Sequence, residues 1–357
     1  MDIQTDHRTD MRRYRVVQWA TGNVGSRALR RAIEHPYLDV VGVYVYGASK
    51  VGRDAGELAG IGPVGVSATN SIEDVIALRP DCVLYMPQYT NHTEVCRLLE
   101  SGINIVTTRT EFLNPDSMNA AVRVRIEAAC RRGDASIHST GCSPGFATEA
   151  LPLVLSSLQR RIDHLSIHEF ADNSSRNSPE MLFEIMGFGQ PPGRPVQARL
   201  DHLRDAFGPS LQLIAKEVGL PLDNIQVSGG LGIARKDTPI AAGMVPAGTV
   251  AAMRTVVSGM RGVKPLMSFT ATWYVSSDVE TSDGERWDFR SSGWRLLVKG
   301  DVPLDVSITY PVAPEDYADM TPGLTAHIPL NAVRYVCEAP AGIRSSADLP
   351  RIVPQLR

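Results

Sequence analysis

The sequence lacks the features that define several large protein classes. Its five cysteines are scattered and form no C-x-x-C pair, which excludes a disulfide framework and argues against a cysteine-ligated zinc site. No apolar run approaches the roughly 18 residues that span a bilayer, and the first residues lack the order of a secretory signal. We therefore expect a cytoplasmic protein that has reduced thiols and no membrane partner.

The sequence also has no large excess of positive or negative charge. The formal net charge is −3, and neither a basic stripe nor a cationic tail is present, which argues against a nucleic-acid partner. The chain has 357 residues, enough for two domains of ordinary globular composition. Residues 1–11 are polar and aperiodic, and we expect them to form a flexible tail.

A glycine turn between an apolar strand and a helix is the most informative motif. Residues 14–31 read YRVVQWATGNVGSRALRR, with β-branched and aromatic residues before the turn and helix formers after it. Gly22 would let the backbone approach a pyrophosphate, and Gly25 would let the helix pack closely on the strand. Ala20 replaces the usual first glycine, which is acceptable if its φ is negative. The turn predicts a dinucleotide site that comprises Ala20, Thr21, Gly22, Asn23, Val24 and Gly25, and the alternative is an ordinary strand-turn-helix connection.

The first half of the chain continues this alternation of strand and helix. Strands are expected at residues 39–46, 64–68, 82–86, 104–108 and 135–139, and helices at 71–78, 92–99 and 118–132. This order predicts a Rossmann-type parallel sheet with helices on both faces. Ligands of such sheets bind at the carboxyl ends of the strands, which adds these candidate cofactor contacts: Met86, Pro87, Thr108, Gly141, Cys142 and Pro144.

The end of the second strand predicts which dinucleotide binds. NAD-binding proteins usually place an acid there for the ribose hydroxyls, but the first acid in YGASKVGRDAG is Asp54, several residues too late. Ser49, Lys50 and Arg53 instead offer a hydroxyl and two cations, which suit a 2′-phosphate. NADP is therefore favoured over NAD, and the alternative is that these cations form a solvated loop.

The second half predicts a different kind of domain. Strands that alternate apolar and polar residues are expected at 162–170, 267–275, 294–299 and 306–310, with helices at 179–186, 203–218 and 325–336. The pattern is typical of an α+β domain with a mostly antiparallel sheet. We predict a dinucleotide-binding domain at residues 12–145, a substrate and dimerisation domain at 146–324, and a C-terminal helix and tail at 325–357 that pack back on the first domain.

Four further segments carry a family resemblance: T-T-R-T-E at 107–111, T-G-C-S-P-G-F at 140–146, G-T-V-A-A-M-R at 248–254 and N-A-V-R-Y-V at 331–336. With the glycine turn, they make the chain resemble the dihydrodipicolinate reductase-like dehydrogenases, in the branch of 2,4-diaminopentanoate dehydrogenases and NADPH-dependent amine dehydrogenases. The His-His and K-x-D-A-P-S-G signature of true dihydrodipicolinate reductases is absent. The resemblance implies a homodimer that reductively aminates a small ketone or aldehyde with ammonia, or deaminates the amine.

In that branch a glutamate after the fifth strand is the proposed catalytic acid/base, and by motif position it falls on Glu111. A carboxylate there can take a proton from ammonia and stabilise an iminium cation, and we expect partial burial to raise its pKa. The alternative is a solvated loop acid. The rival chemistry is acyl transfer by a Cys142 thiolate with His168 or His327 as its base. A catalytically idle NADPH sensor is a third hypothesis.

The substrate pocket is expected to include Phe146, His168, Phe170 and Asp172. His164, His168 and Glu169 lie in one predicted strand, but strand alternation places the two histidines on one face and Glu169 on the other. We therefore predict no metal site. The physiological substrate does not follow from the sequence, because the pocket depends on how loops pack.

Overall fold

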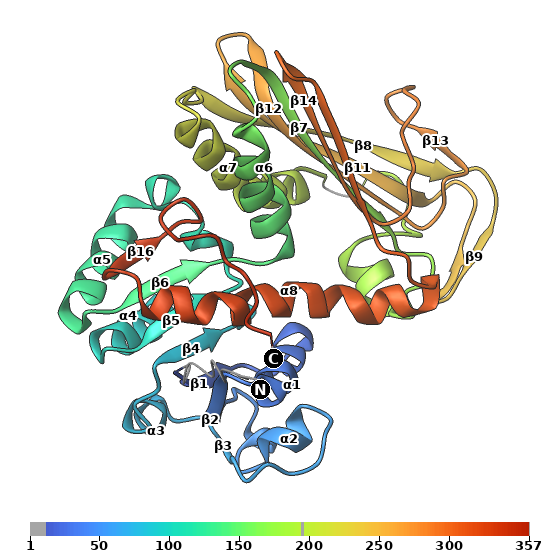
Figure 1. Cartoon of the computed structure of the whole chain (residues 1–357). Coiled ribbons are helices and arrows are strands. Elements are labelled where there is room, and N and C mark those ends of the chain that lie inside the picture. Colours follow the sequence, from blue (N-terminus) through green and yellow to red (C-terminus); the bar gives the residue numbers. More distant parts are fainter. Residues whose placement is uncertain (1–11, 194–195, 357) are drawn as a thin grey trace, which may run out of the picture. The chain divides into compact units, whose positions relative to one another are not determined.

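The computed structural model describes residues 12–193 and 196–356, which form two compact units (Figure 1). The first unit combines the residues up to Gly141 with those from Pro322 onward, and the second comprises Cys142–Thr321. The tail predicted at residues 1–11 lies outside the described residues. Within the described ranges, every helix is too short or too polar to cross a membrane.

The first unit is built on a seven-stranded sheet in which every neighbouring pair of strands is parallel. The β-branched and apolar residues of its central strands are buried on both faces, as expected for a parallel sheet. This is the Rossmann-type sheet that the sequence predicts. Its strands, in spatial order, are β16 (Gly342–Arg344), β6 (Ser136–Ser139), β5 (Asn104–Thr107), β4 (Cys82–Tyr85), β1 (Tyr14–Trp19), β2 (Leu38–Tyr44) and β3 (Ala68–Thr69).

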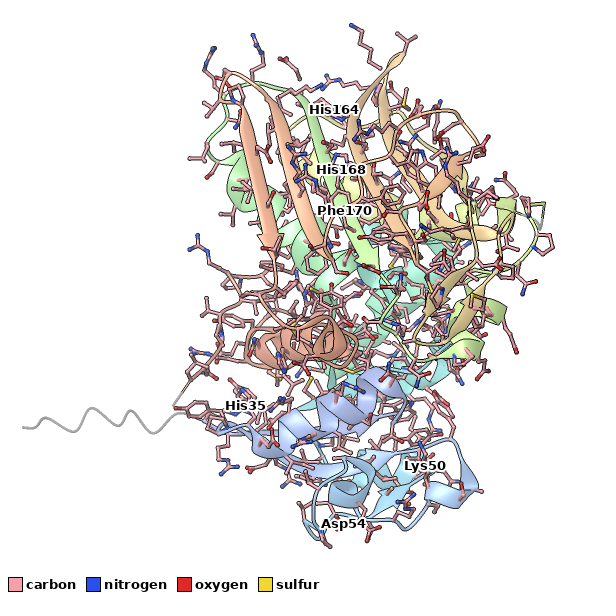
Figure 2. The ribbon with its side chains drawn as sticks, turned by 90° about the vertical axis from the view of Figure 1, so that its right-hand side faces the viewer. His35, Lys50, Asp54, His164, His168 and Phe170 are labelled. Carbon is pink, nitrogen blue, oxygen red and sulfur yellow. The ribbon has the colours of Figure 1, made fainter. Side chains whose placement is uncertain are left out.

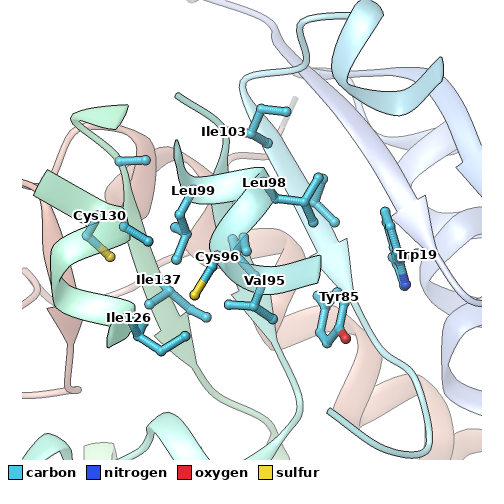
Figure 3. Packing of buried hydrophobic residues seen from close by; sticks show 14 of the residues in the cluster. Trp19, Tyr85, Val95, Cys96, Leu98, Leu99, Ile103, Ile126, Cys130 and Ile137 are labelled. Carbon is cyan, nitrogen blue, oxygen red and sulfur yellow. The ribbon is translucent and has the colours of Figure 1, made fainter. Parts of the chain in front are cut away.

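Helices cover both faces of this sheet. On one face, α1 (Asn23–Glu34) and the part of α8 (Pro314–Cys337) that belongs to this unit contribute Ala28, Leu330 and Val333 to one core. On the other face lie α3 (Ile72–Ala77), α4 (His92–Glu100) and α5 (Ala120–Gly133). Figure 3 shows Trp19 and Tyr85 of the sheet beside Val95 and Leu98 of α4. Helices packed on both faces thereby fix the positions of the strands whose carboxyl ends form this edge of the sheet.

The first unit differs from the predictions in several details, of which the unpredicted edge strand β16 is one. The strand expected at residues 64–68 is confined to Ala68–Thr69, because the Val64 and Gly65 amides donate to Asp54 instead of a neighbouring strand. Asp54 also caps the short helix α2 (Ala55–Leu58). The helix expected from residue 118 begins at Ala120, where the Asn119 side chain accepts from two backbone amides of its first turn.

The second unit is built on a mixed, mostly antiparallel sheet of seven strands. Helix α7 (Val196–Glu217) packs on it, α6 (Leu151–Ser156) precedes its first strand, and β9 (Thr238–Ile240) pairs with β10 (Gly243–Val245) as a separate hairpin. The strands, in spatial order, are β13 (Val279–Thr281), β8 (Asn224–Ala234), β11 (Val250–Arg261), β12 (Lys264–Tyr274), β7 (Ile162–Asp172), β14 (Gly293–Gly300) and β15 (Leu304–Thr309).

The second unit also departs from the sequence pattern. Its strands β8, β11 and β13 were not predicted, and there are differences in strand direction and in helix α8. β7 and β12 were expected in an antiparallel sheet, and they are parallel to each other, because the chain crosses over between them instead of turning back in a hairpin. Helix α8 begins at Pro314 and not near residue 325, although it contains Pro322 and Pro329. Each proline removes one backbone hydrogen bond, but α8 continues through both.

Candidate active site

The glycine turn has the backbone of a dinucleotide-binding loop. Strand β1 ends at Trp19, and Gly22 is the N-cap of α1, with φ −76° and ψ −167°. Gly22 has no side chain that could accept a hydrogen bond from the first turn of α1, and the described residues include no side-chain cap there. The N–H groups at this helix end are therefore not capped by the protein, and they carry the positive end of the helix dipole.

Ala20 adopts a conformation that the sequence argument did not allow. Its φ is +71°, so the expectation of a negative φ is wrong. The turn keeps the left-handed geometry for which glycine is usual, and alanine bears the steric cost. The buried Gln18 side chain braces this conformation, because its Nε2 donates to the carbonyl of Ala20 at 3.0 Å.

The two glycines of the turn differ in how much space surrounds them. A Cβ added to Gly25 would lie 2.2 Å from the Ala20 carbonyl oxygen, so this position has no room for a side chain. A Cβ added to Gly22 would meet no protein atom within 4 Å. Gly22 thus exposes open backbone beside the uncapped end of α1, which fits the pyrophosphate of a dinucleotide.

Lysine 50 contacts the turn directly. Its Nζ donates to the carbonyl and to Oγ1 of Thr21, both at 3.0 Å, and Figure 2 shows Lys50 with Asp54 in this part of the chain. The side chain of Arg53 forms a long ion pair with Glu57, with 3.8 Å between Nε and Oε2. The Asp54 carboxylate is occupied by backbone amides, and the hydrogen bonds from Val64 and Gly56 lower its pKa. Cations, and no free acid, therefore follow strand β2.

The remaining cofactor candidates follow strand ends. Met86 and Pro87 follow β4, Thr108 follows β5, and Gly141 follows β6, so parallel pairing places all four at the same sheet edge as the turn. Asn23 and Val24 begin α1, and Ser49 lies in a short 3-10 turn at Ala48–Lys50. Cys142 and Pro144 belong to the second unit.

Glu111 lies in a 3-10 turn, Thr110–Phe112, shortly after β5. Its Oε1 accepts from Nη2 of Arg109 at 2.8 Å and from Oγ1 of Thr90 at 3.0 Å. Its Oε2 is buried and has no hydrogen-bond partner among the described residues. The side chain is therefore fixed through one oxygen, while the other remains available to accept a proton or a hydrogen bond.

The pKa of Glu111 is lowered, so the expectation of a raised pKa is wrong. Burial alone would raise it, but the hydrogen bond and charge of Arg109 and the hydrogen bond of Thr90 together outweigh burial. The group is a carboxylate at neutral pH. It is thus suited to accept a proton and to stabilise a cation.

The sequence argument missed Arg109 and Thr90. Arg109 is held by its Nη1 donating to the Gln88 carbonyl at 2.8 Å and by its Nε donating to Thr90 at 3.2 Å. Its own carbonyl accepts from the Ser139 hydroxyl, which ties it to β6. A signal for Arg109 was present, since residues two apart on an extended backbone project to the same side, which lets a cation there pair with the acid.

Cys142 has the environment of a structural thiol. It is buried, and burial raises its pKa to about 12, with the charge of Glu169 acting in the same direction. His168 donates to or accepts from Ser166 and stacks on Phe170, and no hydrogen bond joins it to Cys142. The thiolate required for acyl transfer is therefore disfavoured.

Of the pocket candidates, the structure brings three together. His168, Phe170 and Asp172 share one face of β7, and Figure 2 shows His164, His168 and Phe170 along that strand. Phe170 lines a cavity of about 400 Å³ with Trp294, Arg290 and Arg295. Phe146 lies in a different element, the irregular helical segment Cys142–Ala150, and its side chain is exposed.

Comparison with known proteins identifies similar chains. No protein-family model matches this sequence. It is 28% identical over 348 residues to an amine dehydrogenase of Streptomyces virginiae, covering 94% of this chain and 95% of that protein. It is 25% identical over 220 residues to a 4-hydroxy-tetrahydrodipicolinate reductase of Synechococcus elongatus, covering 54% of this chain and 74% of that protein.

A solved structure shares the fold of nearly the whole chain. The amine dehydrogenase of Mycobacterium smegmatis superimposes with a TM-score of 0.73 at 20% identity, covering 96% of this chain and 97% of that one. The predicted resemblance is thereby confirmed, as is the combination of a Rossmann-type sheet with a mostly antiparallel one. By sequence this chain is similar to one amine dehydrogenase, and by fold it is similar to another.

Proposed function

We propose that the protein is an NADPH-dependent oxidoreductase that acts on C–N bonds. It aminates a small ketone or aldehyde with ammonia, and in reverse it deaminates the amine. The observation that carries this proposal is the Glu111 carboxylate, which follows a central strand with one oxygen clamped by Arg109 and the other unpartnered. The similarity to an amine dehydrogenase supports the same reaction class.

The glycine turn supports a nicotinamide dinucleotide as the cofactor. Gly22 and the uncapped start of α1 would hold the pyrophosphate, and the bound dinucleotide supplies the hydride. The Lys50 ammonium has three N–H groups and uses two of them on Thr21, so one remains for a 2′-phosphate. Because Asp54 is occupied, no acid competes for the ribose, and NADPH is favoured over NADH.

Glu111 supplies the proton chemistry. As a carboxylate it accepts through Oε2 the proton that ammonia releases when it adds to the carbonyl, and it returns that proton to the hydroxyl group that leaves as water. Charged again, it stabilises the iminium cation that gains the hydride, and deamination follows the same steps in reverse. Arg109 and Thr90 keep the other oxygen in place, so the base stays oriented while it is charged. The acid/base role of Glu111 therefore needs only groups of the first unit.

The test is a substrate screen with two cofactors. Oxidation of NADPH and of NADH is followed with ammonia and a panel of small ketones and aldehydes. The proposal expects turnover that depends on ammonia and is faster at low NADPH than at low NADH. If cofactor binds and no carbonyl is turned over, the chain is instead the catalytically idle sensor.

A further inference from the structure

A second carboxylate in the molecule is held by two indoles and by no cation. Oε1 of Glu169 accepts from Nε1 of Trp273 at 2.9 Å, and Oε2 accepts from Nε1 of Trp294 at 3.0 Å. Trp294 lies directly opposite Glu169 in the β7–β14 pair, and Trp273 pairs with Ala171, two residues farther along β7. All three side chains therefore project from one face of the sheet.

The charge of this carboxylate is not balanced inside the protein. No ion pair joins Glu169 to a lysine, arginine or histidine in the part of the chain that the structure describes. Arg176 acts electrostatically on Tyr317 but does not pair with Glu169. A carboxylate offers about four acceptor positions, and the indoles occupy two. Glu169 thus has spare acceptor capacity and an uncompensated charge, and it is only partly buried.

The neighbours of Glu169 are neutral and mostly aromatic. The ring of Tyr310 is edge-on to Trp294 with centroids 5.9 Å apart, and the ring of Tyr317 is 6.3 Å from Tyr310. Burial raises the pKa of Tyr310 and of Cys142, so both groups are uncharged near neutral pH. These surroundings offer rings for the carbon atoms of a ligand and one negative charge for a cationic nitrogen.

We propose that Glu169, flanked by Trp273, Trp294, Tyr310 and Tyr317, binds the ammonium group of a small organic amine. The alkyl part of the ligand lies against the rings, and its N–H groups occupy the two acceptor positions that the indoles leave open. A hard divalent metal ion is disfavoured, because the site provides one carboxylate and few other oxygens. That the ligand is a substrate or product rests on the proposed function, whereas binding itself does not.

The test measures amine binding by the full chain without cofactor. Calorimetric titration compares n-butylammonium with n-pentanol, a neutral molecule of similar size. The variants are Glu169→Gln, which keeps the side-chain shape and removes the charge, and Glu280→Gln, a control at an exposed glutamate of the same sheet. The proposal expects Glu169→Gln to weaken n-butylammonium binding by about tenfold or more, because a charge-assisted hydrogen bond is lost. Binding by Glu280→Gln is expected to be unchanged.

A loss smaller than about tenfold in folded Glu169→Gln overturns the proposal. If that variant does not fold, the comparison of the two ligands on the wild-type protein is the test. The proposal requires n-butylammonium to bind more tightly than n-pentanol, and equal affinities overturn it. Because no turnover is measured, the outcome is independent of the proposed function. Amine binding without catalysis would contradict the proposed oxidoreductase function, but it would still support the amine site at Glu169.

Discussion

Arg109 and Glu111 are joined by a 2.8 Å hydrogen bond from Nη2 to Oε1, while Oε2 of the same carboxylate is buried and has no hydrogen-bond partner within residues 12–193 and 196–356. The arginine therefore fixes one oxygen and lowers the pKa of the group, and it leaves the second oxygen to meet a ligand. This division of one carboxylate into a held oxygen and a free oxygen is what a positioned base requires.

Replacing Arg109 should raise the pKa of Glu111. In Arg109→Met the charge and hydrogen bond that lower the pKa are lost, while burial, which raises it, remains. We expect the acid limb of the pH profile of kcat/KM to move to higher pH. The control is Arg131→Met, which removes an exposed arginine that pairs with Glu127. An acid limb that does not move would show that Glu111 is not the titrating base.

The two glycines of the turn should respond differently to alanine. Gly25→Ala forces a Cβ to within 2.2 Å of the Ala20 carbonyl oxygen and should lower the free energy of unfolding by about 2 kcal/mol or more. Gly22→Ala meets no protein atom and has a permitted backbone conformation, so stability should change by less than about 1 kcal/mol. NADPH affinity should nevertheless fall in Gly22→Ala, because the methyl group fills the backbone surface that the phosphates approach. Denaturant unfolding measures the stability of each variant, and fluorescence titration measures its NADPH affinity. Unchanged NADPH affinity in folded Gly22→Ala would contradict the placement of the pyrophosphate at this turn.

Ala20→Gly should stabilise the protein. The native φ of +71° costs alanine roughly 1 kcal/mol that glycine does not bear, and the larger freedom of glycine in the unfolded chain offsets part of this gain. We expect a net increase of about 0.5 kcal/mol in the free energy of unfolding, with NADPH affinity retained. Destabilisation would mean that the alanine methyl makes packing contacts worth more than the strain.

Cys142→Ala should leave turnover within about threefold of the wild type, because burial raises the pKa of the thiol to about 12 and disfavours the thiolate. Iodoacetamide should label Cys142 slowly at neutral pH for the same reason. Rapid labelling of this residue, together with loss of turnover in the alanine variant, would restore the cysteine nucleophile.

The architecture could be predicted because periodic patterns are local. The alternation of strand and helix around the glycine turn specified the parallel sheet, and the N-cap role of Ser71 followed from an acid three residues later. Strand β16 was not predicted, because Gly342–Arg344 is too short to show a periodic pattern. The start of α8 was not predicted, because Pro322 interrupts the helical pattern before the helix expected at residues 325–336.

The contacts of the candidate site could not be predicted, since they depend on side chains far apart in the sequence. Glu111 was found by its place after β5, but the hydrogen bond and charge of Arg109, with a smaller contribution from Thr90 21 residues away, reverse the effect expected from burial. The φ of Ala20 follows from the turn and not from the residue type. The indoles around Glu169 come from 104 and 125 residues away.

The most direct test of the account is the rate of NADPH oxidation by Glu111→Gln in a single turnover with ammonia and a carbonyl that the wild type accepts. The control is Glu73→Gln, an exposed glutamate of the same unit that pairs with Arg97. We predict that Glu111→Gln lowers the rate by about a hundredfold or more while its NADPH affinity is unchanged, because a positioned base contributes on this scale. A rate within about threefold of the wild type, with Glu73→Gln also unaffected, would contradict the assignment of Glu111 as the base.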